Sequence, residues 1–176
     1  MNVAGHFLVA TPVIASPPFA RSVILMLEHD DSGAVGVILN AGTTIPVADH
    51  LPEIAHLVVE PETIFVGGPV ASDTAILLGR SHTAAFLRPT ALETIGILDV
   101  DGLPSDLAAL RVFAGYAGWS PYQLEAEIDG GSWWVLPVER SLVFAADTST
   151  LWDSVVASAP GTIPFHLTFP YDVSLN

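Results

Sequence analysis

The stretch SVILMLEHDDSGAVGVIL, residues 22–39, decides the fold class of this protein. It contains two apolar runs, residues 22–28 and 34–39, on either side of the turn-forming segment HDDSG. Apolar, β-branched runs with this spacing predict a β-hairpin. Because both runs are apolar on each face of the pleat, we expect the hairpin to lie at the centre of a sheet that is covered on both sides.

Short elements are predicted on both sides of this hairpin. The chain has 14 glycines and 14 prolines, which favour many short segments over a few long ones. Helical periodicity predicts three helices, at residues 44–58, 120–128 and 149–158, the last with Leu151, Trp152, Val155 and Val156 facing inward. Further strands are predicted at residues 7–10, 63–67, 75–80, 94–100 and 111–116, and a second hairpin at residues 133–138 and 141–145. The sequence therefore predicts one mixed α+β domain and not a regular βαβ series.

The composition excludes several chemistries. The 176 residues include no Cys and no Lys, which rules out thiol nucleophiles, Cys-ligated zinc, disulfides, a PLP Schiff base and a Walker A phosphate loop. Five Arg against 19 Asp and Glu give a net charge of -14. A field of this sign repels phosphate backbones and anionic membranes. We therefore expect no cofactor, no direct nucleic-acid partner and no membrane partner.

The balance of apolar and charged residues bears on assembly and location. Hydrophobic residues make up 51% and charged residues only 14% of the chain, against about 25% charged in a typical soluble protein. This excess predicts apolar surface beyond one core, and we expect a homodimer. Residues 1–19 lack a basic residue and are interrupted by Pro12, so we interpret them as a first strand and not as a signal peptide, which places the protein in the cytoplasm.

Residues 118–122, Gly-Trp-Ser-Pro-Tyr, superficially match the G-x-S-x-G nucleophile elbow of hydrolases. The residue after the serine must donate a backbone N–H to the oxyanion hole, and Pro121 has none. The pattern is typical of a helix start, with Ser120 as N-cap, Pro121 in the first turn and Gln123 closing a capping box.

Acidic side chains on the predicted helices have structural interpretations. Glu125 and Glu127 stand about 200° apart on a helix of 3.6 residues per turn, so they cannot form an acid–base pair on one face. Asp49, Glu53 and His56 share the face opposite an apolar stripe, which favours a solvated surface over a metal site.

His29 and a pair of glycines are the remaining candidates for chemistry. His29 ends a central strand beside Glu28 and Asp30, where it can act as a general base or ligand, or as a turn residue whose ring satisfies backbone groups. Gly67 and Gly68 follow a strand and can cradle an anion or form a tight bend. If the chain has a small-ligand pocket, we expect these residues to border it. The candidate ligand-binding residues are His29, Asn40, Gly67, Gly68 and Glu125, with no metal site.

Several segments between residues 5 and 158 occur together in an order that is typical of one protein family. They are GHFLVATP (5–12), FARSV (19–23), EH (28–29), GAVGVILN (33–40), FVGGPV (65–70), GYAGW (115–119), QLEAE (123–127), Trp133, LVF (142–144) and Trp152. On these motifs the chain resembles the AlgH/YqgE family. The resemblance implies a domain over residues 5–160, followed by an irregular tail over residues 161–176.

The resemblance implies a fold but no defined activity. Members of the family are bacterial, cytosolic and built as a single mixed α/β domain whose sheet curls into a barrel-like arrangement. No enzymatic activity is established for them, and one branch is labelled a transcriptional regulator of exopolysaccharide synthesis. The structural motif of this chain then comprises Gly115, Gly118, Trp119, Ser120 and Gln123. The chain departs from the family pattern where Ala41-Gly42 replaces a basic residue and proline, and where Ser16 replaces an aspartate.

Three functions remain open from the sequence. The favoured one is a non-enzymatic binding or regulatory domain that acts through protein or small-ligand contacts. The second is an enzyme or metal binder that uses His29, Asn40 and the acids of residues 123–127. The third is a regulator that binds nucleic acid directly, which the net charge of -14 disfavours.

Overall fold

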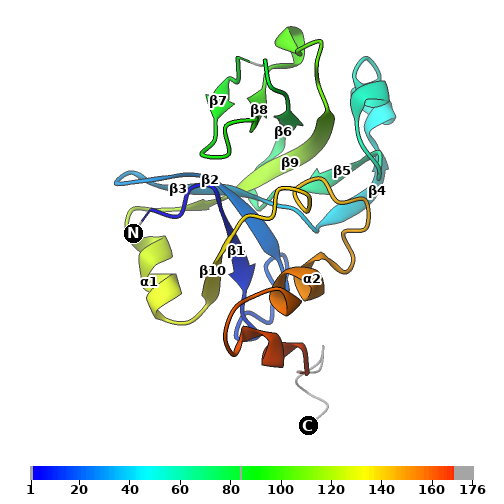
Figure 1. Cartoon of the computed structure of the whole chain (residues 1–176). Coiled ribbons are helices and arrows are strands. Elements are labelled where there is room, and N and C mark those ends of the chain that lie inside the picture. Colours follow the sequence, from blue (N-terminus) through cyan, green and yellow to red (C-terminus); the bar gives the residue numbers. More distant parts are fainter. Residues whose placement is uncertain (1, 84, 169–176) are drawn as a thin grey trace.

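A single curled sheet organises residues 2–83 and 85–168, which the computed structural model describes. Its ten strands run in the order β10-β1-β2-β3-β9-β6-β8-β7, with β5 beside β9 and β4 beside β5 (Figure 1). The strands are β1 (His6–Ala10), β2 (Val23–Asp30), β3 (Gly33–Ile38), β4 (Gly42–Pro46), β5 (Thr63–Val66), β6 (Val70–Arg80), β7 (Arg88–Pro89), β8 (Ile95–Leu98), β9 (Ala109–Trp119) and β10 (Trp133–Pro137). The long strand β9 joins the two halves of the sheet, because its end pairs with β3 and its beginning with β5 and β6.

The predicted central hairpin is confirmed. Strands β2 and β3 pair antiparallel, with Leu25 opposite Val37. Successive side chains of β2 pack in two different hydrophobic clusters. Leu25 lies in the cluster that contains Phe7 and Trp152, whereas Ile24 lies in the cluster that contains Trp119 and Trp133. Alternate side chains of a strand point to opposite faces, so the hairpin is covered on both sides.

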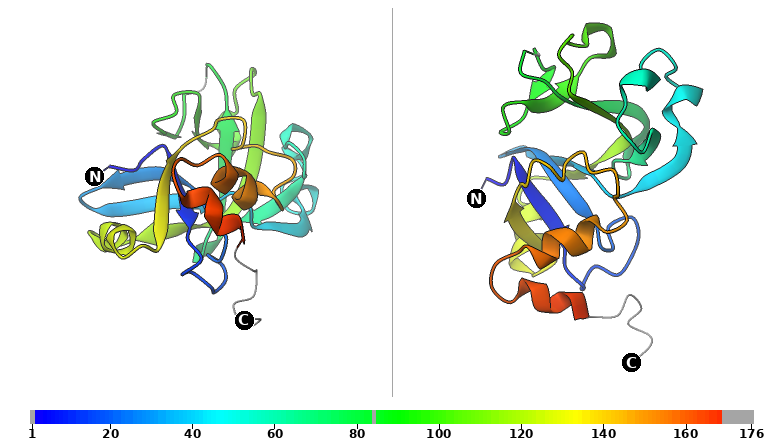
Figure 2. Two further views of the ribbon diagram at one scale, coloured as in Figure 1. Left: turned by 60° about the horizontal axis from the view of Figure 1, so that its bottom comes forward. Right: turned by 45° about the vertical axis from the view of Figure 1, so that its right-hand side comes forward.

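Two α-helices occur in the described residues, α1 (Gln123–Asp129) and α2 (Leu151–Ala157). Both lie at the end of the molecule opposite β7 and β8 (Figures 1 and 2). Leu151, Trp152, Val155 and Val156 of α2 are buried, as their helical spacing predicted. The short 3-10 helices are Val47–Asp49, Ala55–Leu57, Val100–Gly102 and Ile163–Thr168.

The predicted helix at residues 44–58 is wrong. Residues at its start belong to β4, which pairs with β5, and the rest forms turns and the 3-10 helices Val47–Asp49 and Ala55–Leu57. Pro52 lacks the backbone N–H that an α-helix would use at this position, and the β-branched Thr44 and Ile45 favour the strand. Ile54 and Val58 of the apolar stripe are nevertheless buried, and Asp49, Glu53 and His56 are exposed as expected.

The predicted second hairpin is also wrong. Strand β10 pairs with β1, and residues 141–145 form turns instead of a partner strand. The side chain of Arg111 provides hydrogen-bond donors for backbone carbonyl groups of this irregular segment. Its guanidinium, fully buried, donates to the carbonyl oxygens of Val143 at 3.4 Å, Ala145 at 3.0 Å and Glu60 at 3.0 Å. Burial lowers the pKa of Arg111 to about 10, so the side chain remains charged at neutral pH.

The proposed C-terminal tail is described only in part. Residues Ile163–Thr168 form a 3-10 helix that contacts α2, and residues 169–176 lie outside the described residues. The boundary at residue 160 therefore stays a prediction. None of the helices in the described part of the chain is long and apolar enough to cross a membrane.

Candidate functional site

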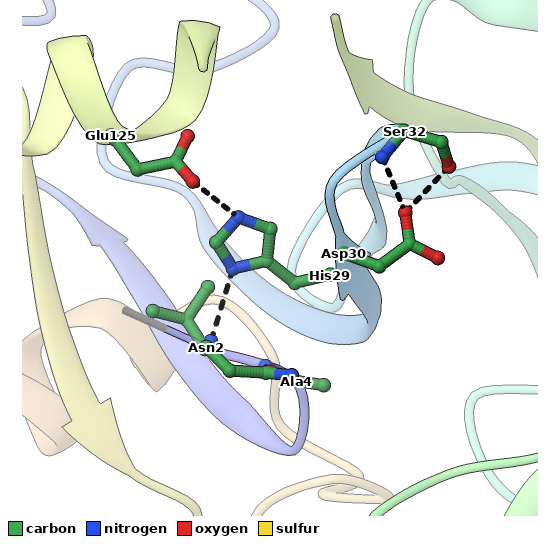
Figure 3. Close-up of polar contacts among 7 residues, drawn as sticks. Asn2, Ala4, His29, Asp30, Ser32 and Glu125 are labelled. Carbon is green, nitrogen blue, oxygen red and sulfur yellow. Dashed lines mark hydrogen bonds and ion pairs between the residues drawn. The ribbon is translucent and has the colours of Figure 1, made fainter. Parts of the chain in front are cut away.

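His29 lies near the end of β2, past an irregularity in the pairing with β3 between Met26 and Glu28, and only 6% of its surface is exposed. The backbone N–H of Val3 donates to its Nδ1 at 3.1 Å. An N–H group can only donate, so Nδ1 is the unprotonated nitrogen and Nε2 carries the proton. The Nε2–H then donates to Oε1 of Glu125 at 3.0 Å (Figure 3).

Glu125 comes from α1, on the other side of the same site. A hydrogen bond from its own backbone N–H and the hydrogen bond from His29 lower the pKa of its carboxyl group, although partial desolvation opposes them. The carboxylate is therefore ionised at neutral pH. The contact joins two segments that lie far apart in the sequence, which orients the carboxylate on the surface.

A polar recess of about 480 Å³ opens beside this pair. Its walls are formed by Asn2, His29, Asp30, Asp31, Tyr122 and Glu125. The backbone N–H and the hydroxyl of Ser32 donate to Asp30 at 2.7 and 2.5 Å (Figure 3), and these hydrogen bonds lower the pKa of Asp30. The recess thus collects three carboxylates and no arginine.

Tyr122 lies at the edge of the recess with 74% of its surface exposed. Its backbone has a φ of 64°, in the left-handed region that a bulky residue rarely adopts. This conformation occurs at the N-cap position of α1. A strained backbone with an exposed aromatic ring is more common at functional sites than on an ordinary surface.

The geometry of the recess suits an organic cation better than a metal ion. Within residues 2–83 and 85–168, no three His, Asp or Glu side chains converge as one metal ion would require. The side chains of the recess instead offer carboxylate oxygens and an aromatic ring, which together attract ammonium and guanidinium groups.

The structure brings together His29 and Glu125 but places the other predicted candidates elsewhere. Asn40 accepts from the backbone N–H of Val23 at 2.9 Å and donates to the carbonyl oxygen of Arg21 at 2.9 Å. Gly67 and Gly68 pack against β9, where an added Cβ would come within 2.1 Å and 2.2 Å of backbone atoms. None of these three residues lines the recess, and each has a local structural role.

Glu127 faces a different environment from Glu125, as the helical spacing predicted. Its Oε2 accepts from the indole Nε1–H of Trp119 at 2.9 Å and of Trp133 at 2.8 Å. Its Oε1 accepts from the side chain of Gln123 at 2.9 Å. The two rings pack edge to face at 6.1 Å. Glu127 therefore holds two nearly buried tryptophans in place.

The predicted capping box is only half formed. The side-chain oxygen of Gln123 accepts from the backbone N–H of Ser120 at 3.0 Å, as expected. However, α1 begins at Gln123 with Tyr122 as its N-cap, and the Ser120 hydroxyl caps none of its N–H groups. The assignment of Ser120 as N-cap is wrong, because residues 121 and 122 form a turn that precedes the helix.

Sequence reasoning missed Asn2, Asp31 and Tyr122. Asp31 lies in the predicted turn after His29, and Tyr122 directly precedes α1, so proximity to the named candidates was a usable signal. The N-terminal residues carried no such signal. Their contact with His29 spans 26 residues and depends on β1 lying beside β2.

Comparisons with known proteins agree with this architecture. A family model described as AlgH-like matches residues 7–164. A UPF0301 protein of Streptomyces coelicolor is 40% identical over 99% of this chain and 96% of its own, and one of Thermobifida fusca is 39% identical over 100% and 96%.

Two solved structures resemble the fold. A protein of Corynebacterium diphtheriae has a TM-score of 0.84 at 31% identity and covers 94% of this chain and 91% of its own. The solution structure of the AlgH protein from Pseudomonas aeruginosa has a TM-score of 0.71 at 24% identity, over 94% of this chain and 93% of its own. The second likeness, at this low identity, concerns the fold alone.

Proposed function

This chain belongs to the AlgH-like family, and we propose that it is a non-enzymatic binding protein that accepts a positively charged group in the recess beside His29 and Glu125. The observation that carries the proposal is the ionised carboxylate of Glu125, which the buried His29 holds at the edge of a recess with two further carboxylates. The charged group is an amine or a guanidinium, from a small ligand or from a side chain of a protein partner.

The carboxylate of Glu125 is accessible to such a ligand. Its Oε1 accepts from His29, and 36% of the side chain is exposed. Hydrogen bonds from a cation to a carboxylate are about twice as strong as those between neutral groups. The exposed ring of Tyr122 provides a face for a cation, which contributes about 0.5–1 kcal/mol at such sites.

The hydrogen bonds of His29 support a role in binding over one in catalysis. A general base needs a free lone pair within reach of the substrate. In His29 the lone pair of Nδ1 accepts from Val3, and the proton of Nε2 is donated to Glu125. Both ring nitrogens are occupied, and the residue is nearly buried. His29 thus supports a positioning role.

The distribution of arginines supports a ligand other than DNA. Arg111 is buried, Arg21 pairs with Asp153 at 2.6 Å and Arg88 pairs with Glu28 at 3.0 Å. The net charge of -14 further opposes a phosphate backbone. Any regulatory role then acts through another protein or a small ligand. The cytoplasmic location and the homodimer stay predictions, the latter to be tested by light scattering.

The proposal is tested with a pair of matched probes. N-acetyl-arginine N-methylamide carries the guanidinium, and its citrulline counterpart has nearly the same shape without the charge. We expect the arginine compound to bind with a millimolar Kd, which corresponds to about -4 kcal/mol. Amide resonances of residues 29–31 and 122–125 should shift in NMR titrations with this compound and not with the citrulline compound.

Glu125→Gln is the critical variant, because a glutamine oxygen still accepts from His29 while the charge is lost. We expect its affinity for the arginine compound to fall at least about fivefold. Glu53→Gln is the matched control, since Glu53 is exposed and lies outside the recess. Equal binding of both probes, or unchanged binding by Glu125→Gln, would contradict the proposal.

A further inference from the structure

A second hollow, of about 360 Å³, lies in the other half of the sheet. It is bounded by β4, β5, β9 and the first half of β6, and by residues that follow β4. Most of its lining is apolar: Ile45, Leu51, Ile64, Ala75, Val112, Phe113 and Ala114. This size falls within the range of about 300–1,000 Å³ that is typical of small-ligand sites.

One wall of the hollow is formed by a bulge in β6. Val70 pairs with Tyr116 of β9, and the next pair is Ala75 with Ala114, so residues 71–74 have one residue of β9 opposite them. The extra residues form an exposed bulge, residues 71–74, beside the apolar floor. The regular ladder resumes beyond Ala75.

The glycine motif FVGGPV makes this bulge possible. Gly67 and Gly68 let the chain pass close to β9, and Gly115 of β9 has a φ of 68° at the point of contact. A Cβ on Gly115 would lie 2.6 Å from the carbonyl oxygen of Val70 and 2.9 Å from that of Gly68. These distances are too short for any side chain. The motif therefore shapes the wall of the hollow, a role that the recess at His29 does not explain.

Polar groups gather at one side of the hollow. His50, Ser72, Asp73 and Thr74 line it, and none of their side chains has a hydrogen-bond or ion-pair partner among the described residues. Asp106, by contrast, accepts from the hydroxyl groups of Ser81 and Thr83. Asp73 is the only carboxylate among the lining residues, and no arginine lines the hollow.

We propose that this hollow binds a small, mainly apolar molecule that carries one positive charge, with its apolar part on the floor formed by Val112 and Ala114 and its charge beside Asp73. An apolar lining with few convergent polar groups is the usual composition of a small-ligand site. The net charge of -14 and the carboxylate of Asp73 select a cation over an anion. This site is separate from the recess at Glu125 and shares no lining residue with it.

The test uses phenethylamine and, as a probe of opposite charge, 3-phenylpropanoate. In NMR titrations we expect phenethylamine to shift the amide resonances of residues 73–75 and 112–114 with a millimolar Kd. The same resonances should respond at least about threefold more weakly to 3-phenylpropanoate. Glu125→Gln should leave these shifts unchanged, which separates this site from the recess.

Two variants locate the ligand within the hollow. Ala75→Phe places a ring in the hollow at an exposed strand position, where an aromatic residue is well tolerated, and should abolish the shifts. Asp73→Asn should lower the affinity for phenethylamine about threefold and should not lower the affinity for 3-phenylpropanoate. Ala157→Phe, on the exposed end of α2, is the control for added bulk, and Asp101→Asn is the control for lost charge.

Three results would overturn the inference. The first is an absence of shifts at residues 73–75 and 112–114 at millimolar phenethylamine. The second is binding that Ala75→Phe does not reduce while the variant retains the dispersed spectrum of the folded protein. The third is concentration-dependent broadening without added ligand that Ala75→Phe removes, which would assign the hollow to contacts between two copies of the chain.

Discussion

Helix α1 presents one carboxylate to each of two regions, Glu125 to the recess and Glu127 to the tryptophan pair. Glu127 accepts from three side-chain donors, two of them on nearly buried indoles. Glu125 accepts from one side-chain donor, His29, and lines the recess with its side chain 36% exposed. Two residues of the same type, separated by one position, thus have different roles because they have different donors. A carboxylate that is saturated by internal donors stabilises the fold, and one that is partly satisfied can bind.

Glu127→Ala provides the strongest test of this contrast. The substitution leaves the indole N–H groups of Trp119 and Trp133 without an acceptor in a nearly buried setting. Unsatisfied buried donors cost about 1–3 kcal/mol each, so we expect a loss of about 2–4 kcal/mol. Urea denaturation followed by tryptophan fluorescence measures it. Glu125→Ala is the comparison and should lose much less, and an equal loss for both variants would remove the distinction.

Gln123→Ala and Ser120→Ala test the start of α1. Gln123 accepts from the backbone of Ser120 and donates to Glu127, so its removal should cost about 1 kcal/mol. The hydroxyl of Ser120 caps no helical N–H, and Ser120→Ala should stay within about 0.5 kcal/mol. Thermal unfolding of the two variants measures the loss of stability that each substitution causes. A larger loss for Ser120→Ala would restore it as the N-cap.

The smallest expected effect is the acid sensitivity that Glu125 contributes. The pKa of Glu125 is lowered in the folded protein, so the folded state binds this proton less tightly than the unfolded state does. The stabilisation is present above the ordinary value of 4.5 and is lost as the pH falls through the lower folded pKa. As the pH falls below 4.5, the free energy of unfolding should therefore decrease less for Glu125→Gln than for the wild type.

Melting temperatures across a series of acidic buffers give the difference between the two proteins. Glu53→Gln is the control for a lost surface charge. Parallel curves for the wild type and Glu125→Gln would show that the folded structure does not favour the ionised form of this carboxyl group.

Periodicity predicted the elements whose apolar pattern and backbone preference agree. In the central hairpin and in α2, the β-branched runs and the helical spacing of Leu151 and Val155 pointed to the elements that formed. Residues 44–58 show the opposite case. Their apolar side chains repeat as in a helix, but Pro52 lacks the N–H of a helical hydrogen bond. The segment forms turns and short 3-10 helices, and Ile54 and Val58 are still buried.

The candidate site was predictable only in part. His29 and Glu125 stood out because each carries a titratable group beside a predicted turn or helix. Asn40 and the glycines stood out because they lie where predicted strands end. They pack elsewhere, because proximity depends on which strands pair. The pairing of β10 with β1 likewise joins strands that lie far apart in the chain. Residues 141–145 instead meet the buried Arg111, whose carbonyl partners there lie 32 and 34 residues away.

By itself, the sequence determined the mixed α+β class, the central hairpin, the acidic character and the exclusion of thiol and lysine chemistry, because these properties follow from local pattern and composition. The tertiary structure alone decided that His29 meets Val3 and Glu125, that Glu127 meets two tryptophans, and that the glycine motif leaves a hollow beside β6. Each of these depends on contacts between strands or helices that are distant in the chain. Such contacts form where burial of a shared core repays the entropy of closing long loops, and no local pattern records that balance.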